Sequence, residues 1–403
     1  MSGIGPDVLA RATWSGLVEP GDAVAGALVG LLGAPEALAW LRAAVEAGDG
    51  LDLGPLEDGR GPLGPAQVAA IGRAVARWSV RLPDCDPQRD LDRLDRIGGA
   101  VLVPGDPRWP APLDDLGVEA PFCVWVRGDL DLATASARSV SIVGSRAATS
   151  YGERVAFDLA DGITVAGGCV VSGGAYGIDA AAHRGAVARG GPTLVFLAGG
   201  VDRAYPAGNA RLLESVVAAG GALASEVPPA SLPTKSRFLQ RNRLIAAAGR
   251  ATVVVEAAWR SGAMSTAHHA ARLLRPVGAV PGPVTSMASA GCHRLLREGV
   301  AVCVTDAAEL RELAALTSED LAAAVRAERA ADARAAHPRD GLDPLAARVL
   351  DAMPRRVPAE LERVASVAGV SVAEARGSLG LLELDGWVIR RSGGWLAVNR
   401  ATP

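Results

Sequence analysis

The chain has 403 residues, which is too long for one typical domain and long enough for a large buried core with one or two smaller domains. Apolar residues make up 49% and charged residues 21%, a balance typical of folded globular proteins and unlike that of disordered or fibrous chains. The formal net charge of −3 argues against a protein that coats duplex DNA through a diffuse basic surface, so any nucleic-acid site must be a local basic patch.

The five cysteines are scattered along the chain and include no C-x-x-C pair, so the sequence indicates neither a disulfide framework nor a zinc site. The chain does not open on a charged segment followed by an apolar one, and no uninterrupted apolar run reaches membrane-spanning length. We therefore expect a cytoplasmic protein without a membrane span, a metal site or a cofactor.

Residues 1–95 carry apolar side chains at helical spacing, interrupted by glycine and proline, and predict a small helical module of the SAM or helix-hairpin-helix kind. The segment Gly30-Leu31-Leu32-Gly33 is a candidate helix-hairpin-helix turn, whose backbone amides hold a phosphate. A glycine-rich turn that merely joins two helices is the commoner alternative.

Residues 96–316 predict a Rossmann-like core. Short apolar runs rich in β-branched residues end in glycine-rich turns and are followed by amphipathic stretches, a pattern typical of repeated βαβ units. The pattern predicts an extended, doubly wound and mostly parallel α/β sheet with its functional edge at the carboxyl ends of the strands. The predicted strands are 139–143, 169–172, 193–197, 222–226, 252–256, 277–280 and 301–304.

Residues 317–340 are rich in Ala, Arg, Glu and Asp without strong apolar periodicity, and we interpret them as a linker. Residues 341–403 predict helix, turn, helix and a hairpin within 386–398, the order of a winged-helix-like domain. Because this tail holds eight arginines against seven acidic residues, it offers little for duplex phosphates, and we favour a protein contact.

The turn after the first core strand begins with Gly144, Ser145 and Arg146. A glycine directly after a strand allows a tight turn, the following helix offers unpaired N–H groups, and an arginine adds a bidentate charge. The turn is therefore either an anion site or a structural turn. It lacks the G-x-G-x-x-G spacing of dinucleotide-binding proteins.

The second strand ends in a turn that contains Gly174 and Tyr176 and precedes Asp179 and His183. We expect Asp179 to cap its helix, and the pairing of Asp179 with His183 to be structural rather than to perform acid–base chemistry. In the third turn Tyr205 precedes a proline, and packing within the loop is as good an interpretation as stacking on a base.

The segment 235–243 is the most informative, because it holds four cations and one aromatic ring in nine residues and includes the only lysine of the chain. This composition suits phosphate pairing and base stacking; a solvated helix start with its phenylalanine in the core is the alternative. The candidate binding residues are Lys235, Arg237, Phe238, Arg241, Asn242 and Arg243.

A small, hydroxyl-rich helix entrance containing Ser261 and Gly262 follows the strand that ends at Glu256, and it suits a phosphate or a close backbone contact. Glu256 is the one strand-end carboxylate with catalytic potential, although a helix-capping or arginine-pairing role is the favoured interpretation.

These turns, in their order and spacing, resemble the DNA-processing protein A (DprA/Smf) family over roughly residues 96–310. The matching motifs are Ile142 to Arg146 with Tyr151-Gly152, Ser172-Gly173-Gly174 with Gly177 to His183, Tyr205-Pro206, Ser225-Glu226, Arg241 to Ile245, Val255-Glu256-Ala257, Ser261-Gly262 with Thr266-Ala267, and Val280-Pro281-Gly282.

The resemblance implies an extended Rossmann fold without catalytic residues that binds and protects single-stranded DNA, helps to load RecA in natural transformation, and forms homodimers. It gives the DNA-facing role to residues 144–146, to 235–238 and to 241–243 of this chain. Two departures bear on affinity: Tyr176 stands where the family often has arginine, and Leu239 follows Phe238 where the family often has proline.

An alternative function is that of a nucleotide-processing hydrolase similar to the Rossmann-like LOG proteins, with Glu256 as the catalytic carboxylate. Those proteins carry a P-G-G-x-G-T-x-x-E loop. Here neither the Pro281-Gly282-Pro283 turn nor the loop after Glu256 contains it, so we favour the binding protein.

Overall fold

A computed structural model describes residues 5–48, 51–58, 61–314, 342–354 and 357–398. The chain divides into two compact units, residues 1–316 and 317–403, and each is described by itself. The predicted linker, residues 317–340, lies outside the described residues.

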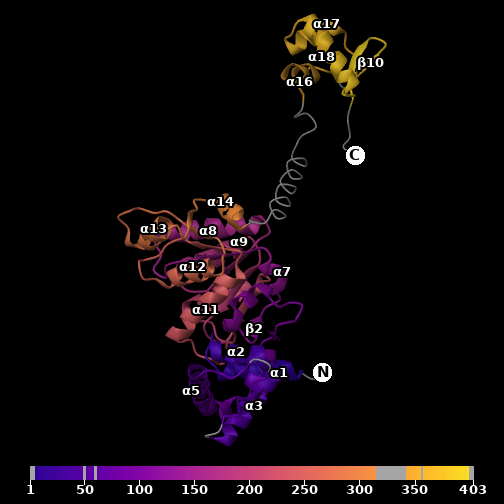
Figure 1. Cartoon of the computed structure of the whole chain (residues 1–403). Helices are drawn as coiled ribbons and strands as arrows, with labels where there is room; N and C mark the ends of the chain where they lie inside the picture. Colours follow the sequence, from indigo (N-terminus) through magenta and orange to yellow (C-terminus); the bar gives the residue numbers. More distant parts are fainter. Residues whose placement is uncertain (1–4, 49–50, 59–60, 315–341, 355–356, 399–403) are drawn as a thin grey trace. The chain divides into compact units, whose positions relative to one another are not determined.

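The first unit begins with helices, as the apolar spacing predicts (Figure 1). Trp14, Trp78 and Leu41 are buried in their shared core, which Phe122 completes. Prolines stand in the first turn of several helices, where a missing N–H leaves no hydrogen bond unmade. The elements are α1 (Pro6–Leu17), α2 (Ala23–Leu32), α3 (Ala34–Ala47), α4 (Gly54–Glu57), α5 (Pro65–Arg81), η1 (Leu82–Asp84) and α6 (Pro87–Asp95).

The predicted four-residue turn at Gly30–Gly33 is shorter in the structure. Gly30 belongs to α2, and Gly33 alone joins α2 to α3 at a φ of 86°, a conformation that L side chains rarely adopt. Over the described residues no single helix is long and apolar enough to cross a membrane; α2 and α3 pass by length and composition only as a pair, bent by 113°.

The N-terminal helices pack directly on the sheet. Ser15 of α1 donates a hydrogen bond to the Glu226 carbonyl at 2.6 Å and accepts one from the Trp125 indole at 2.9 Å. All three groups are buried. This contact between α1 and two distant strand ends places the helices and the sheet in one compact unit.

The sheet has nine strands in the order β1-β2-β6-β5-β4-β3-β7-β8-β9. All seven predicted strands are present, some of them one to two residues shorter, and β3 to β9 pair in parallel. Two antiparallel strands at one edge were not predicted. The strands are β1 (Gly99–Leu102), β2 (Val124–Arg127), β3 (Ser139–Val143), β4 (Cys169–Ser172), β5 (Thr193–Leu197), β6 (Ala222–Ser225), β7 (Ala251–Val254), β8 (Val277–Ala279) and β9 (Val302–Cys303).

Helices cover both faces of the sheet, as continuous apolar strands require. One face packs against α8 (Ser150–Val165), α9 (Ile178–Ala188) and α14 (Ala307–Ala314), the other against α11 (Lys235–Ala248) and α12 (Gly262–Arg272). The remaining elements of this unit are η2 (Ala111–Glu119), α7 (Leu132–Ser136), η3 (Ala207–Asn209), α10 (Ala210–Ala218), η4 (Met287–Ser289) and α13 (Ala290–Arg297).

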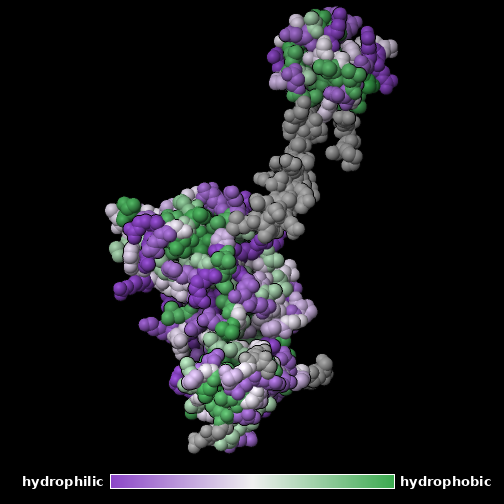
Figure 2. All heavy atoms as spheres, in the orientation of Figure 1, coloured by the Kyte–Doolittle hydropathy of each residue, from purple (hydrophilic) through white to green (hydrophobic). Residues whose placement is uncertain are grey.

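The chain order reverses between β3 and β7, because β3 continues to β4 on one side and α11 returns the chain to β7 on the other. In open α/β sheets such a switch point leaves a crevice at the carboxyl ends of the strands. Hydrophilic side chains are interspersed with apolar ones over the visible face of this unit (Figure 2).

The second unit has the predicted winged-helix order. A capping box in which Ser371 and Glu374 bond each other's backbone N–H opens its third helix. Ala359 pairs with Trp395 and adds a bridge to the hairpin. The elements are α16 (Pro344–Asp351), α17 (Leu361–Ala368), α18 (Val372–Leu384), β10 (Val388–Arg391) and β11 (Gly394–Ala397).

Candidate functional site

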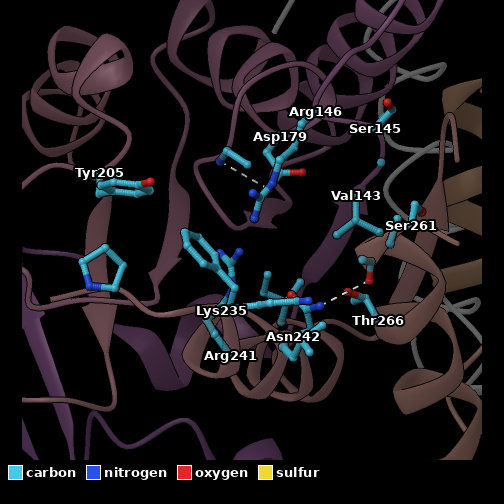
Figure 3. A pocket seen from close by; sticks show the side chains of 18 of the residues that line it. Val143, Ser145, Arg146, Asp179, Tyr205, Lys235, Arg241, Asn242, Ser261 and Thr266 are labelled. Atoms are coloured by element: carbon cyan, nitrogen blue, oxygen red, sulfur yellow. Dashed lines mark hydrogen bonds between the residues drawn. The ribbon is translucent and has the colours of Figure 1, made fainter. Parts of the chain in front are cut away.

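A pocket of about 650 Å³ opens at the switch point (Figure 3). Its walls are the turns that follow β3, β4 and β7, together with Tyr205 and the first turns of α11. Nine of the predicted binding residues line it: Gly144, Ser145, Arg146, Lys235, Phe238, Arg241, Asn242, Ser261 and Gly262.

Hydrogen bonds to Glu256 hold the β3–α8 turn in place. The Ser145 N–H donates to the Glu256 carbonyl at 2.7 Å, and the buried carboxylate accepts the N–H and the hydroxyl of Thr149 at 2.9 and 2.6 Å. A side chain at Gly144 would lie 2.5 Å from Ile178, so only glycine fits there. Glu256 therefore supports the start of α8, as the capping interpretation holds, and it does not line the pocket.

The β4–α9 turn is organised by Asp179, which does not cap its own helix as predicted. The residue at the N-terminal cap is Gly177, with a φ of 71°, and the Asp179 carboxylate instead accepts the N–H groups of Gly173 and Ala175 at 3.2 and 3.4 Å. Burial raises the pKa of Asp179, whereas the nearby Arg241 charge lowers it. The carboxylate thus shapes a glycine turn that α9 continues.

Arg241 holds the same turn from the other side. One of its terminal nitrogens donates to the carbonyls of Gly173 and Phe196 at 2.7 and 2.6 Å, and the side chain is buried. Burial lowers its pKa to about 10, and Asp179 opposes that shift. Asn242, the next residue, donates to the Gly262 carbonyl at 3.2 Å and ties α11 to the β7–α12 loop. Both residues line the pocket and at the same time fix its walls.

An aromatic and cationic cluster forms one side of the pocket. The Arg146 guanidinium carbon lies 4.6 Å from the centre of the Phe238 ring, a cation–π distance. The Tyr205 ring lies 5.7 Å from the Phe238 ring at an interplanar angle of 51°. Phe238 is therefore a partly exposed pocket wall rather than a core residue, and Tyr205 packs against it.

Two cations of the pocket remain available to a ligand. Arg146 and Lys235 are exposed, and neither forms an ion pair or a side-chain hydrogen bond with the part of the chain that the structure describes. Lys235 opens α11, whose N-terminal backbone groups add a partial positive charge. In the same described part, the buried Arg241 Nε and Ser261 Oγ have no hydrogen-bond partner. A polar, anionic ligand suits this set of groups.

Four predicted residues lie outside the pocket lining. Arg243 is fully buried and forms a bidentate ion pair with Glu226 at 2.6 and 2.8 Å. Arg237 pairs with Glu19 of the α1–α2 turn, with both contacts at 2.9 Å. Because an acidic partner neutralises each arginine, in the interior for Arg243 and at the surface for Arg237, the structure does not place them among the groups open to DNA.

Gly174 and Tyr176 complete that set of four. Gly174, at a φ of 67°, faces Val195, and a side chain there would clash with it. Tyr176 is 48% exposed and packs against Gly208, where an added Cβ would lie 2.5 Å from the tyrosine hydroxyl. Asn209, which was not predicted, donates to the carbonyls of Gly174 and Ala175 at 2.9 and 3.1 Å and so braces this turn.

His183 is a buried structural residue. Its Nδ1 lies 2.7 Å from the Thr193 hydroxyl, which itself donates to the Val170 carbonyl at 2.8 Å, so Nδ1 carries the proton. Burial lowers the pKa of His183 to about 3. Across the described residues no group of three or more His, Cys, Asp or Glu side chains is arranged to hold a metal ion.

The fold and the pocket define a doubly wound α/β protein with a cation-lined pocket at the switch point, joined in sequence to a winged-helix domain. The family described as DNA recombination-mediator protein A matches residues 100–315, and the DprA winged helix domain matches residues 333–394. The chain therefore belongs to the DNA recombination-mediator protein A family, the DprA/Smf family that the turns resemble.

Similar proteins cover most of the chain. The putative DNA processing protein DprA of Mycobacterium tuberculosis is 41% identical over 350 residues, which are 83% of this chain and 87% of that protein. Protein Smf of Escherichia coli is 36% identical over 211 residues, 52% of this chain and 56% of that protein. The X-ray structure of DNA processing protein A from Streptococcus pneumoniae matches with a TM-score of 0.57 and 28% identity, over 76% of this chain and 97% of that chain.

Proposed function

We propose that this protein binds single-stranded DNA in the pocket at the switch point and has no catalytic activity of its own. The observation that carries the proposal is the pair of un-neutralised cations, Arg146 and Lys235, beside the partly exposed Phe238 ring. Cations that follow the backbone and aromatic rings that stack on bases are the two components of single-strand binding.

An unpaired strand suits this site better than a duplex. The aromatic wall lies inside a pocket with the cations around it, so a base must leave its stack to reach Phe238. A base in a duplex would pay the energy of unpairing and unstacking first. Because every base has an aromatic face, we expect binding with little sequence preference.

The positions of the acidic and histidine side chains support a binding role over an enzymatic one. Glu256 and Asp179 accept backbone N–H groups, and His183 bonds to Thr193 inside the fold. The catalytic carboxylate of the alternative hydrolase would be Glu256, which does not line the pocket. Release of free base from nucleoside monophosphates by the purified protein would contradict our proposal.

We further propose that the bound strand is passed to RecA and that two copies associate through the sheet-bearing unit. The description of the family as a recombination mediator supports the first part. The edge strand β9, with Val302 54% exposed, supports the second. A cytoplasmic location, where free cysteines persist and RecA acts, belongs to the same proposal.

The winged helix is proposed to contact a protein partner. Leu381 and Leu384 of α18, one turn apart on the helix, are 61% and 85% exposed, and Glu383 and Asp385 lie beside them. An apolar and acidic surface suits a protein and repels phosphates.

The direct test removes the two free cations. Arg146→Ala combined with Lys235→Ala is expected to weaken binding of a labelled oligothymidine about tenfold or more at low salt. The slope of log affinity against log salt should become less negative by about 1.4, since each single-strand phosphate contact contributes about 0.7.

A matched control removes two exposed arginines of the N-terminal helices, Arg42→Ala with Arg73→Ala, and so changes the net charge by the same amount. The control should keep the wild-type affinity and salt slope. Equal affinity of the Arg146 and Lys235 double variant and the wild type would refute the pocket as the binding site.

A further inference from the structure

Trp259 is an aromatic side chain that the pocket does not include. It lies in the loop between β7 and α12 and is 46% exposed. The chain has eight tryptophans, of which six are buried and Trp395 is half-buried. Single exposed apolar residues are common on protein surfaces, so the exposure of Trp259 gains its meaning from its position next to the pocket.

The ring is held in place by its surroundings. The Arg294 guanidinium carbon of α13 lies 5.0 Å from the Trp259 ring centre, and Glu298 in turn bonds Arg294 at 2.8 Å. The loop backbone is bonded on both sides, because Ala257 donates to the Ala288 carbonyl and accepts from the Gly291 N–H, both at 2.7 Å. Trp259 thus forms a platform whose position is supported by the Arg294 contact and by the backbone bonds of Ala257.

The platform stands at the rim of the pocket. Ser261, two residues further along the loop, and Gly262, the first residue of α12, line the pocket. Two residues span at most about 7 Å of chain, so the Trp259 backbone lies within that distance of the pocket wall. Arg260, between them, is exposed and adds a cation to the same rim. A strand that leaves the pocket past Ser261 would pass close to the loop that carries the indole.

We infer that Trp259 is a second base-stacking site, which takes the nucleobase adjoining those held in the pocket. The inference rests on the proposed single-strand binding and extends the footprint beyond the Phe238 pocket. Arg294 over the ring would strengthen the stack, as cation–π contacts do. The ligand class is an unpaired nucleobase of any identity, attached to a strand longer than the pocket accommodates.

A purely structural role is the competing explanation. In that case Trp259 would serve only to pair with Arg294 and fix α13 to the loop. The two roles predict different effects on binding affinity. Loss of a stacking site weakens binding only of a strand that carries bases, whereas a structural change of the pocket weakens binding of a strand with or without bases.

The experiment measures binding of oligothymidine and of an abasic oligonucleotide of the same length to the full chain, for wild type, Trp259→Leu and Trp259→Phe. Trp259→Leu should bind oligothymidine about fivefold more weakly or worse, fivefold being the low end of measured stacking contributions. Its affinity for the abasic strand and its salt slope should equal those of the wild type, because no cation is removed. Trp259→Phe, which keeps an aromatic face, should recover most of the loss.

Intrinsic fluorescence gives a second readout, since oligothymidine should quench the wild type more than Trp259→Phe. Equal oligothymidine affinity of Trp259→Leu and wild type, or an equal loss on the abasic strand, would overturn the inference. Failure of the wild type to bind oligothymidine at low salt would instead overturn the proposed function itself, so the two failures are distinguishable.

Discussion

Glu226→Ala is expected to lower the free energy of unfolding by about 3–5 kcal/mol, the effect of breaking a buried ion pair from one side. The Arg243 guanidinium is fully buried, and its two terminal nitrogens donate to the Glu226 carboxylate at 2.6 and 2.8 Å. Without the carboxylate, a charge with no access to water remains inside the protein. Urea denaturation followed by tryptophan fluorescence measures the change.

The matched control is Glu19→Ala, which breaks the more exposed pairs of Glu19 with Arg237 and Arg81. Half of the Glu19 side chain is in water, so we expect a loss within about 1 kcal/mol. Replacing Glu226 and Arg243 together by apolar residues should restore part of the stability lost in Glu226→Ala. Equal losses for Glu226→Ala and Glu19→Ala would contradict the importance of burial.

The second large effect is a loss of stability in acid caused by His183. Its pKa is about 3 in the folded protein, because burial disfavours the charged ring, against 6.5 for an exposed histidine. Between these values the unfolded chain binds a proton that the folded chain excludes, so stability falls as the pH drops from about 6.5 towards 3. The contribution to the slope approaches about 1.4 kcal/mol per pH unit.

His183→Leu tests this assignment, because leucine is of similar size and cannot titrate. The Thr193 hydroxyl keeps its bond to the Val170 carbonyl, so no buried donor is orphaned. Unfolding free energies of the two proteins should run parallel above pH 7, and below pH 6 the free energy of the wild type should fall more steeply than that of His183→Leu. Parallel curves down to pH 4 would show that His183 does not cause the acid sensitivity.

The strands that sequence predicts are those with continuous apolar runs. The parallel strands β3 to β7 are buried on both faces, so nearly every residue in them must be apolar or small, as residues 139–143 are. The antiparallel edge strand β1 is only partly buried, and its three residues of intermediate burial followed by one buried leucine leave no such pattern. Its pairing with β2 depends on tertiary contacts that local sequence does not encode.

At the site, the turns were predictable and the fate of each arginine was not. Gly144 and Ser261 could be selected as candidate binding residues from local sequence alone, because a glycine or a hydroxyl residue after a strand is typical of a binding turn. Whether an arginine of α11 meets a ligand or a carboxylate depends on residues far away in the chain. Glu19 neutralises Arg237 from 218 positions away. Asp179 was misassigned for a different reason, because the N–H groups that donate to its carboxylate lie in a nearby turn whose shape the sequence does not give.

The helix α11 both lines the pocket and anchors the N-terminal helices and the sheet, and this double role limits how the protein can be rearranged. Its pocket side carries Lys235 and Phe238, while Arg237 and Arg243 reach back to Glu19 and Glu226. The backbone carbonyl of Glu226 also accepts a hydrogen bond from the Ser15 hydroxyl. The N-terminal helices therefore cannot be exchanged independently of α11. A chimera that takes them from a relative must also take their partner residues on α11, because otherwise the contacts that position Lys235 and Phe238 are lost.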